Sequence, residues 1–196
     1  VYTLLSCIGV TLGGVINRTV STWNGNVSVN DSGNIATTLA SLTRNAGELV
    51  SGSPYSITAA SFNALTGSAA GNYNAPSFTG SPTLAITQAS LTGSIANQTK
   101  VYGADDPTLS VLGVALGGVI NRTVVTWNGN VAVNDTGNVA TTLASLTRNA
   151  GELVSGSPYN ITAATFNSLT GSAAGNYNAP SFTGSPTLTI NQATLS

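Results

Sequence analysis

The chain has few charged residues and no histidine. Only 6% of its 196 residues are charged, five basic and six acidic, where an ordinary soluble domain has about a quarter. Five basic side chains are too few for a phosphate backbone, so we expect no nucleic-acid partner. Without histidine the chain cannot build a Ser-His-Asp triad or most zinc sites. We therefore expect no enzyme activity, no cofactor and no metal centre.

Long apolar runs and thiols are scarce as well. No apolar stretch reaches the eighteen or so residues of a membrane-spanning helix, so no transmembrane segment is expected. The chain starts at Val1 without a charged and then apolar leader, so a signal peptide would have been removed or would lie upstream. The single Cys7 aligns with Val111 of the second half and is expected to be a small buried hydrophobe. Such sparing use of thiols fits a secreted protein.

Hydroxyl and amide side chains take the place of charges. Ser, Thr and Asn number 23, 28 and 21, which together make 72 of the 196 residues. Hydrophobic residues still make up 41%, and the mean hydropathy is +0.22. Disordered chains combine low hydrophobicity with high net charge, and this chain has neither. We expect a folded protein whose surface is hydrated by hydroxyls and amides.

The chain is a tandem repeat. Residues 12–91 return as residues 116–195, an offset of 104, and seventy of the eighty aligned positions are identical. This predicts two domains, residues 1–88 and 89–196, the first of which lacks most of its opening strand. By the offset Val1 aligns with Asp105; alternatively, Val1-Tyr2 corresponds to Val101-Tyr102 with a deletion. In either case the first sheet is expected to have an unpaired edge, open to strand addition.

Each repeat is predicted to be a set of short strands. The β-rich segments of the second repeat are 108–114, 122–127, 131–133 and 187–190, and residues 139–148 favour a strand over a helix. Asn128-Gly129 and residues 134–138 are turn sequences on either side of Val131–Val133, which predicts hairpins. In that strand Ala132 is replaced by Ser28 in the first repeat, which suggests that the two valines face inward. The predicted fold is all-β: two tandem β-sandwich-like (immunoglobulin-like or related) domains arranged end to end.

Three segments of the second repeat resemble, in order, the MBG/YDG-type tandem β repeats of large bacterial surface adhesins. They are TKVYGADDPTL (99–109), GSPYNIT (156–162) and GNYNAPSFTGSPTLTI (175–190). The first repeat carries only the last two. The resemblance covers almost the whole chain, although Ser-Pro before Tyr159 and the long unit depart from the family pattern. It implies a β-rich stalk module of an exported protein, which holds a binding tip away from the cell.

A few residues are candidates for a site. Asp105 and Asp106 are weak candidates for calcium ligands, but an acidic turn is the preferred interpretation. Lys100, the only lysine, could form an amide crosslink with Asn178 or Asn191, assisted by Glu152, as some surface β modules do; an exposed motif lysine is preferred. Two aromatic pairs could in principle stack on sugars, although core and corner roles are favoured: Trp23/Trp127 and Tyr73/Tyr177.

The leading hypothesis is therefore a structural one. The repeats are expected to act as stalk or spacer units of a secreted or surface-anchored bacterial adhesin, with neighbouring identical repeats as partners and an unknown receptor. The alternative is a self-assembling extracellular fibre subunit joined by strand donation into the first repeat. A carbohydrate-binding module is the third hypothesis.

Overall fold

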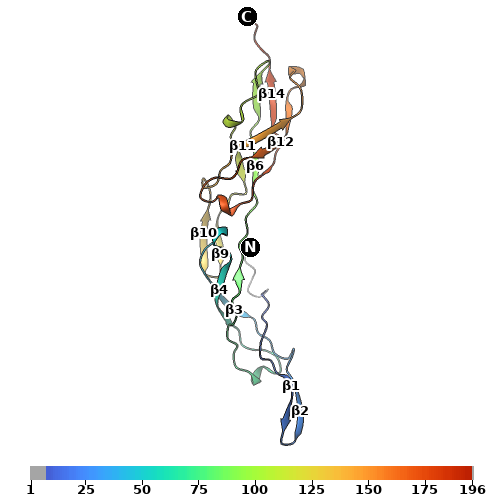
Figure 1. Cartoon of the computed structure of the whole chain (residues 1–196), viewed down its shortest axis with the longest axis vertical. Helices are drawn as coiled ribbons and strands as arrows, with labels where there is room; N and C mark the ends of the chain where they lie inside the picture. The colour runs from blue at the N-terminus through green and yellow to red at the C-terminus, as the bar shows by residue number, and fades with distance from the viewer. Residues whose placement is uncertain (1–7, 196) are drawn as a thin grey trace. The chain divides into compact units, whose positions relative to one another are not determined.

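The regular structure of the chain consists of strands and short 3₁₀ turns (Figure 1). The computed structural model describes residues 8–195, so Cys7 lies outside the described residues. The all-β prediction is confirmed. Over the described residues, no helix is long and apolar enough to cross a membrane.

The elements of the first repeat are β1 (Asn17–Thr22), β2 (Gly25–Asn30), β3 (Leu39–Arg44), β4 (Tyr55–Phe62) and β5 (Thr83–Leu84), with 3₁₀ turns η2 (Val50–Gly52) and η3 (Ala70–Asn72). Those that follow are β6 (Thr92–Ser94), β7 (Gln98–Val101), β8 (Ala115–Gly117), β9 (Asn121–Thr126), β10 (Gly129–Asn134), β11 (Leu143–Arg148), β12 (Tyr159–Phe166), β13 (Ser181–Phe182) and β14 (Thr187–Asn191). Their 3₁₀ turns are η4 (Leu109–Val111), η5 (Val154–Gly156) and η6 (Ala174–Asn176).

The chain forms two compact units. Over the described residues, unit 1 comprises 8–48, 52–85 and 124–131, and unit 2 comprises 49–51, 86–123 and 132–195. The main change of unit falls between Ala85 and Ile86. The tip of the β9–β10 hairpin, residues 124–131, belongs to unit 1.

The repeated sequence produces repeated strand pairing. β3 pairs with β4 from Leu39↔Phe62, and β11 pairs with β12 from Leu143↔Phe166, with register irregularities at the same places in both pairs. β1 and β2 form an antiparallel hairpin, and β9 and β10 form a two-stranded sheet. Asn128 lies in the predicted turn between β9 and β10, and Gly129 is the first residue of β10. One register therefore serves both repeats.

Two details of the predicted strands are wrong. Residues 108–114 contain the 3₁₀ turn η4, and the strand begins only at Ala115. In β10, Val133 is half-buried but Val131 is 38% exposed, because a two-stranded hairpin has no second layer covering its whole face. Apolar composition alone does not say whether a β-branched run has a neighbouring strand to pair with.

Unit 2 contains two sheets whose members come from distant parts of the chain. One has the order β11-β12-β14-β7, and the other has the order β13-β6-β8. The β14–β7 and β13–β6 pairs are parallel, with Leu188 opposite Gln98 and Ser181 opposite Thr92. Segment 89–101 therefore contributes a strand to each sheet of unit 2.

The same segment supplies side chains to both apolar clusters of unit 2. Leu91 packs with Val139, Ala173 and Tyr177, whereas Ile95 packs with Leu143 and Ile161; all of them are at most 8% exposed. Gly93 is needed where the chain passes Phe166, since a Cβ there would lie 2.5 Å from the ring. Burying these side chains is the main source of stability in such a fold.

A tyrosine ties a loop to each hairpin. The Tyr177 hydroxyl donates to Asp135 Oδ2 at 2.7 Å and accepts from the Ile120 N–H at 2.8 Å. Tyr73 repeats this contact with Asp31 and Ile16, both at 2.8 Å. Tyr177 is 2% exposed and Tyr73 is half-buried. Burial, opposed by the Ile120 hydrogen bond and helped by Asp135, raises the pKa of Tyr177. Tyr177 is thus a core residue, as expected from the sequence, whereas Tyr73 is only half-buried.

Removing this hydroxyl gives a first prediction. Tyr177→Phe should lower the free energy of unfolding of unit 2 by about 1–2 kcal/mol, because it leaves the partly buried Ile120 N–H and the Asp135 carboxylate without their partner. Tyr73→Phe, the matched variant, should cost less in unit 1, because water reaches the half-buried site. Urea unfolding of both variants measures the difference. Equal or inverted losses would contradict burial as the deciding factor.

Candidate functional site

The most concentrated group of charges is a four-residue ion cluster in unit 2. Lys100 Nζ lies 2.7 Å from Asp106 Oδ1 and 2.6 Å from Glu152 Oε2. Arg148 Nε donates to Asp106 Oδ2 at 2.9 Å, and Arg148 also pairs with Glu152. The structure thus brings two of the predicted crosslink residues, Lys100 and Glu152, together with one of the two calcium candidates, Asp106.

Local structure positions each member of this ion cluster. Lys100 lies on β7, and the turn after it, closed by the Ala104 N–H to Val101 O hydrogen bond at 3.0 Å, returns Asp106 toward it. Arg148 ends β11 and donates to the carbonyls of Asn149 and Gly151 at 3.0 and 2.8 Å. The cluster therefore joins β7, the following loop, β11 and the turn that precedes η5.

The charges fix one another's protonation states. The hydrogen bonds that Lys100 donates to Asp106 and then to Glu152 raise its pKa. Arg148 above all, and Lys100 with it, lowers the pKa of Asp106, while Lys100 and Arg148 lower the pKa of Glu152. The Lys100 side chain is 6% exposed, whereas those of Asp106 and Glu152 are about half exposed. The expectation of an exposed lysine is therefore wrong, because the two carboxylates and Arg148 surround its ammonium group. At neutral pH all four groups are ionised.

This arrangement differs from what an amide crosslink requires. A lysine that attacks an amide must first lose its proton, and here two carboxylates hold the ammonium form. The described contacts of Lys100 do not include Asn178, whose backbone N–H instead donates to Ala89 O at 2.9 Å. Asn191 follows Ile190, the residue paired with Lys100, and is exposed. Lys100 and Glu152 meet, but no candidate asparagine joins them in the described structure.

The two calcium candidates, Asp105 and Asp106, have different surroundings. Both oxygens of Asp106 are occupied by cationic partners, and Asp105 is exposed. Over residues 8–195 no group of three or more acidic, histidine or cysteine side chains lies close enough to hold a metal ion. The electrostatic role of Asp106 is to bind Lys100 and Arg148.

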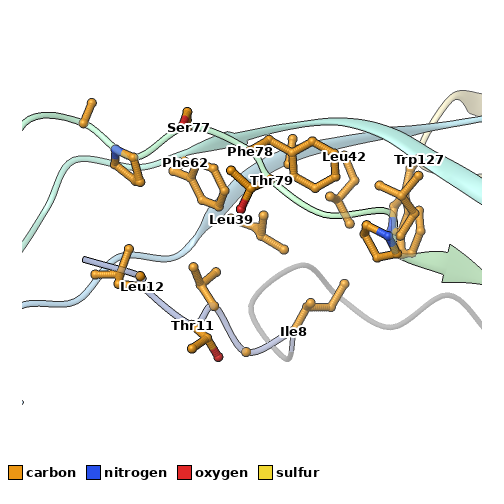
Figure 2. A pocket seen from close by; sticks show the side chains of 18 of the residues that line it. Ile8, Thr11, Leu12, Leu39, Leu42, Phe62, Ser77, Phe78, Thr79 and Trp127 are labelled. Atoms are coloured by element: carbon orange, nitrogen blue, oxygen red, sulfur yellow. The ribbon is translucent and has the colours of Figure 1, made fainter. Parts of the chain in front are cut away.

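The second feature is an apolar groove of about 740 Å³ in unit 1 (Figure 2). Its walls come from residues 8–13, from β3 and β4, and from residues 75–79. Leu39, Leu42 and Phe62 project into it from the sheet, facing Ile8 and Leu12 across the opening. Trp127, from the β9–β10 tip, lies at the end near Leu42. The described lining contains the hydroxyl side chains of Thr11, Ser77 and Thr83 but no charged side chain, so the groove is an uncharged, mainly apolar surface.

Unit 2 shows what fills the equivalent space there. Leu143, Ile161 and Phe166, the counterparts of Leu39, Ile57 and Phe62, pack against Ile95. Leu188 and Ile190 on β14 are each 2% exposed, whereas the equivalent Leu84 and Ile86 are half-buried. Over the described part of unit 1, β5 pairs only with β4, and no strand takes the place of β7.

The exposure of the two tryptophans does not match the expectation that they are core residues. Trp23 is 105% exposed at the tip of β1–β2, whereas Trp127 is half-buried. The Trp23 expectation is therefore wrong, because its hairpin tip extends away from any described wall. Identical local sequence gives the same hairpin, but tertiary surroundings decide how much of the indole is covered.

Comparison of the chain with family models, with curated proteins and with solved structures finds no match. The resemblance to MBG/YDG-type repeats thus remains an expectation from the sequence.

Sequence reasoning missed the contribution of Arg148. The signal was present, since Arg148 and Glu152 are four residues apart and Lys100 precedes Asp106 by six. The turn between Lys100 and Asp106 could be anticipated from Tyr102-Gly103. The approach of β11 could not, because it depends on the long-range sheet order.

The ion cluster generates a prediction on acid stability. The pKa values of Asp106 and Glu152 are lowered on folding, so their contribution exists above the unfolded pKa values and is lost as pH falls below about 4. Asp106→Asn should lower the free energy of unfolding at pH 7 by at most about 1 kcal/mol, given its exposure, and flatten the decline at acid pH. Denaturant unfolding from pH 7 to pH 3 measures both.

Asp105→Asn is the matched control, because no ion pair among the described residues involves Asp105. Its unfolding curves should follow the wild type. If the two variants behaved alike, net charge rather than the ion cluster would explain the acid dependence.

Proposed function

We propose that the chain consists of structural spacer repeats, the stalk units of a secreted or surface-anchored bacterial adhesin. In this proposal each repeat contributes a sandwich-like domain, and the domains stand end to end. The observation that carries it is that two nearly identical sequences form the same strand pairs with the same register. A chain built for reach needs units that fold in the same way wherever they occur.

The composition supports the same proposal. Lys100, Arg148, Asp106 and Glu152 neutralise one another in the ion cluster, and Arg44 pairs with Glu48. A chain whose surface has so few uncompensated charges keeps its length when the salt concentration changes, because there is little charge repulsion for salt to screen. The Lys100–Asp106 pair also gives a physical role to the Lys-x-Tyr-Gly segment on which the adhesin-repeat resemblance rests.

Small-angle scattering at low protein concentration tests the spacer proposal. A single compact globule of this length would have a radius of gyration of about 16 Å, whereas two units of ~40 Å in line would give about 23 Å or more. We expect the larger value, unchanged between 20 and 500 mM salt. A value near 16 Å would contradict the extended arrangement.

A second candidate function is a fibre subunit joined by strand donation, which the open groove favours. The groove of unit 1 presents the apolar wall that Ile95 covers in unit 2, beside a β5 edge that has no β7-like partner among the described residues. An extended chain with the sequence of residues 89–104 would bury its apolar side chains there and pair in parallel with β5.

A synthetic peptide of residues 89–104 tests this candidate. Added to the full chain, it should bind with an affinity in the micromolar range and protect the amides of residues 83–86 from hydrogen exchange. The matched peptide with Ile95→Asp should bind at least ten-fold more weakly, since a carboxylate would enter the apolar wall. Equal binding of both peptides, or no binding, would reject the groove as a strand acceptor.

A further inference from the structure

The tip of β9–β10 makes a two-point contact with the edge strand β3 inside unit 1. Asn128 Nδ2 donates to Arg44 O at 2.6 Å, and the Arg44 N–H donates to Asn128 Oδ1 at 3.2 Å. A side-chain amide thus satisfies both backbone groups of one residue, as a neighbouring strand would. Arg44 is 3% exposed in this setting.

The preceding residue adds an apolar contact to the same site. Trp127 lines the groove of unit 1 together with Leu42 and Ile57 (Figure 2). Trp127-Asn128 therefore acts as a plug, in which the indole covers apolar side chains while the amide pairs with the strand edge. Aromatic anchors beside a satisfied polar contact are typical of interaction hot spots.

The β1–β2 hairpin carries the same plug with nothing to cover it in the described structure. Trp23-Asn24 is held as Trp127-Asn128 is: the Asn24 N–H donates to Thr22 Oγ1 at 3.2 Å, and Thr22 Oγ1 donates to Gly25 O at 2.7 Å. The corresponding distances at the second tip are 3.1 and 2.7 Å. Trp23 is nevertheless 105% exposed, and no described residue bonds to the Asn24 side chain.

Unit 2 carries the matching acceptor. Arg148 ends the edge strand β11 as Arg44 ends β3, with the same register shift and the same bonds to two following carbonyls. Beside it is a hollow of about 360 Å³ lined by Leu146 and Ile161, the counterparts of Leu42 and Ile57. Pro107 and Leu109 also line it. In the described structure no side chain bonds to the backbone of Arg148 as Asn128 does to Arg44.

We propose that the Trp23-Asn24 tip of one copy of this chain binds the Arg148 edge and adjacent hollow of a second copy. The Asn24 amide pairs with the backbone N–H and C=O of Arg148, and the indole of Trp23 enters between Leu146 and Pro107. Tip and hollow are different surfaces, so the contact is heterologous and adds copies head to tail. This inference does not depend on the spacer role or on strand donation.

The proposed contact between tip and hollow is small, so its affinity is expected to be low. A tip of a few residues lies below the area of a stable interface, so we expect a dissociation constant between about 0.1 and 1 mM. Where the tip and the acceptor belong to one chain, the chain holds them close together, and this high effective concentration compensates for the weak affinity. Head-to-tail association should therefore be visible in concentrated solutions.

The test uses sedimentation velocity and amide chemical shifts of the full chain from 10 μM to 1 mM. For the wild type, the sedimentation coefficient should rise with concentration, and the amide signals of Leu146 and Arg148 should shift in step. Trp23→Ala and Asn24→Ala, which alter only exposed side chains, should each reduce the association at least five-fold. In a Trp127→Phe chain, the emission of Trp23 should move to shorter wavelength as concentration rises.

Leu195→Ala is the matched control, since Leu195 is 96% exposed and lies outside both the tip and the hollow. It should associate as the wild type does. A chain that stays monomeric at 1 mM with unshifted signals, or association that persists in Trp23→Ala, would overturn the proposal. Association that the 89–104 peptide abolishes and Trp23→Ala leaves intact would also overturn it, and would indicate strand donation instead.

Discussion

Insertion of segment 89–101 is the interaction on which the order of unit 2 depends. It supplies a parallel partner to β13 and another to β14, and it places Leu91 and Ile95 in separate apolar clusters. Both parallel pairs join residues about ninety positions apart in sequence. Contacts of that range are formed at a large cost in chain entropy, so they persist only where burial repays it. The segment therefore completes both sheets, with β6 between β13 and β8 and β7 at the edge beside β14.

The two repeats form an internal comparison of that effect. β3–β4 and β11–β12 pair in one register, so the antiparallel part of the fold is encoded within the shared sequence. The buried Leu188 and Ile190 and the half-buried Leu84 and Ile86 have nearly the same neighbours in sequence but not in space. Burial is thus a property of the completed unit, and local sequence determines only the elements that pair locally.

The same distinction explains what sequence could predict. Asn128-Gly129 and the alternating runs predict the hairpins and β11–β12, since turns and β-branched residues act over a few positions. The assignment of a strand to 108–114 failed because η4 forms there and packs Leu109 and Leu112 against the apolar cluster around Ile95, a long-range contact that a β-rich run does not reveal. At the ion cluster, the pairing of Arg148 with Glu152 follows from their spacing, while its contact with Asp106 requires β11 and the loop after β7 to meet. The sequence identifies the charged residues, but the order of the strands decides which of them come together.

Because the sequence is repeated, the chain cannot pair every hairpin tip with a strand end of its own. Each repeat carries one tip sequence, Trp-Asn-Gly, and one strand end that closes with Thr-Arg. In unit 1 the second tip meets the first strand end, at Arg44. One tip, at Trp23, and one strand end, at Arg148, are left over. Adding identical repeats raises both numbers equally, so pairing of this kind within one chain, as at Asn128 and Arg44, still leaves one tip and one strand end over.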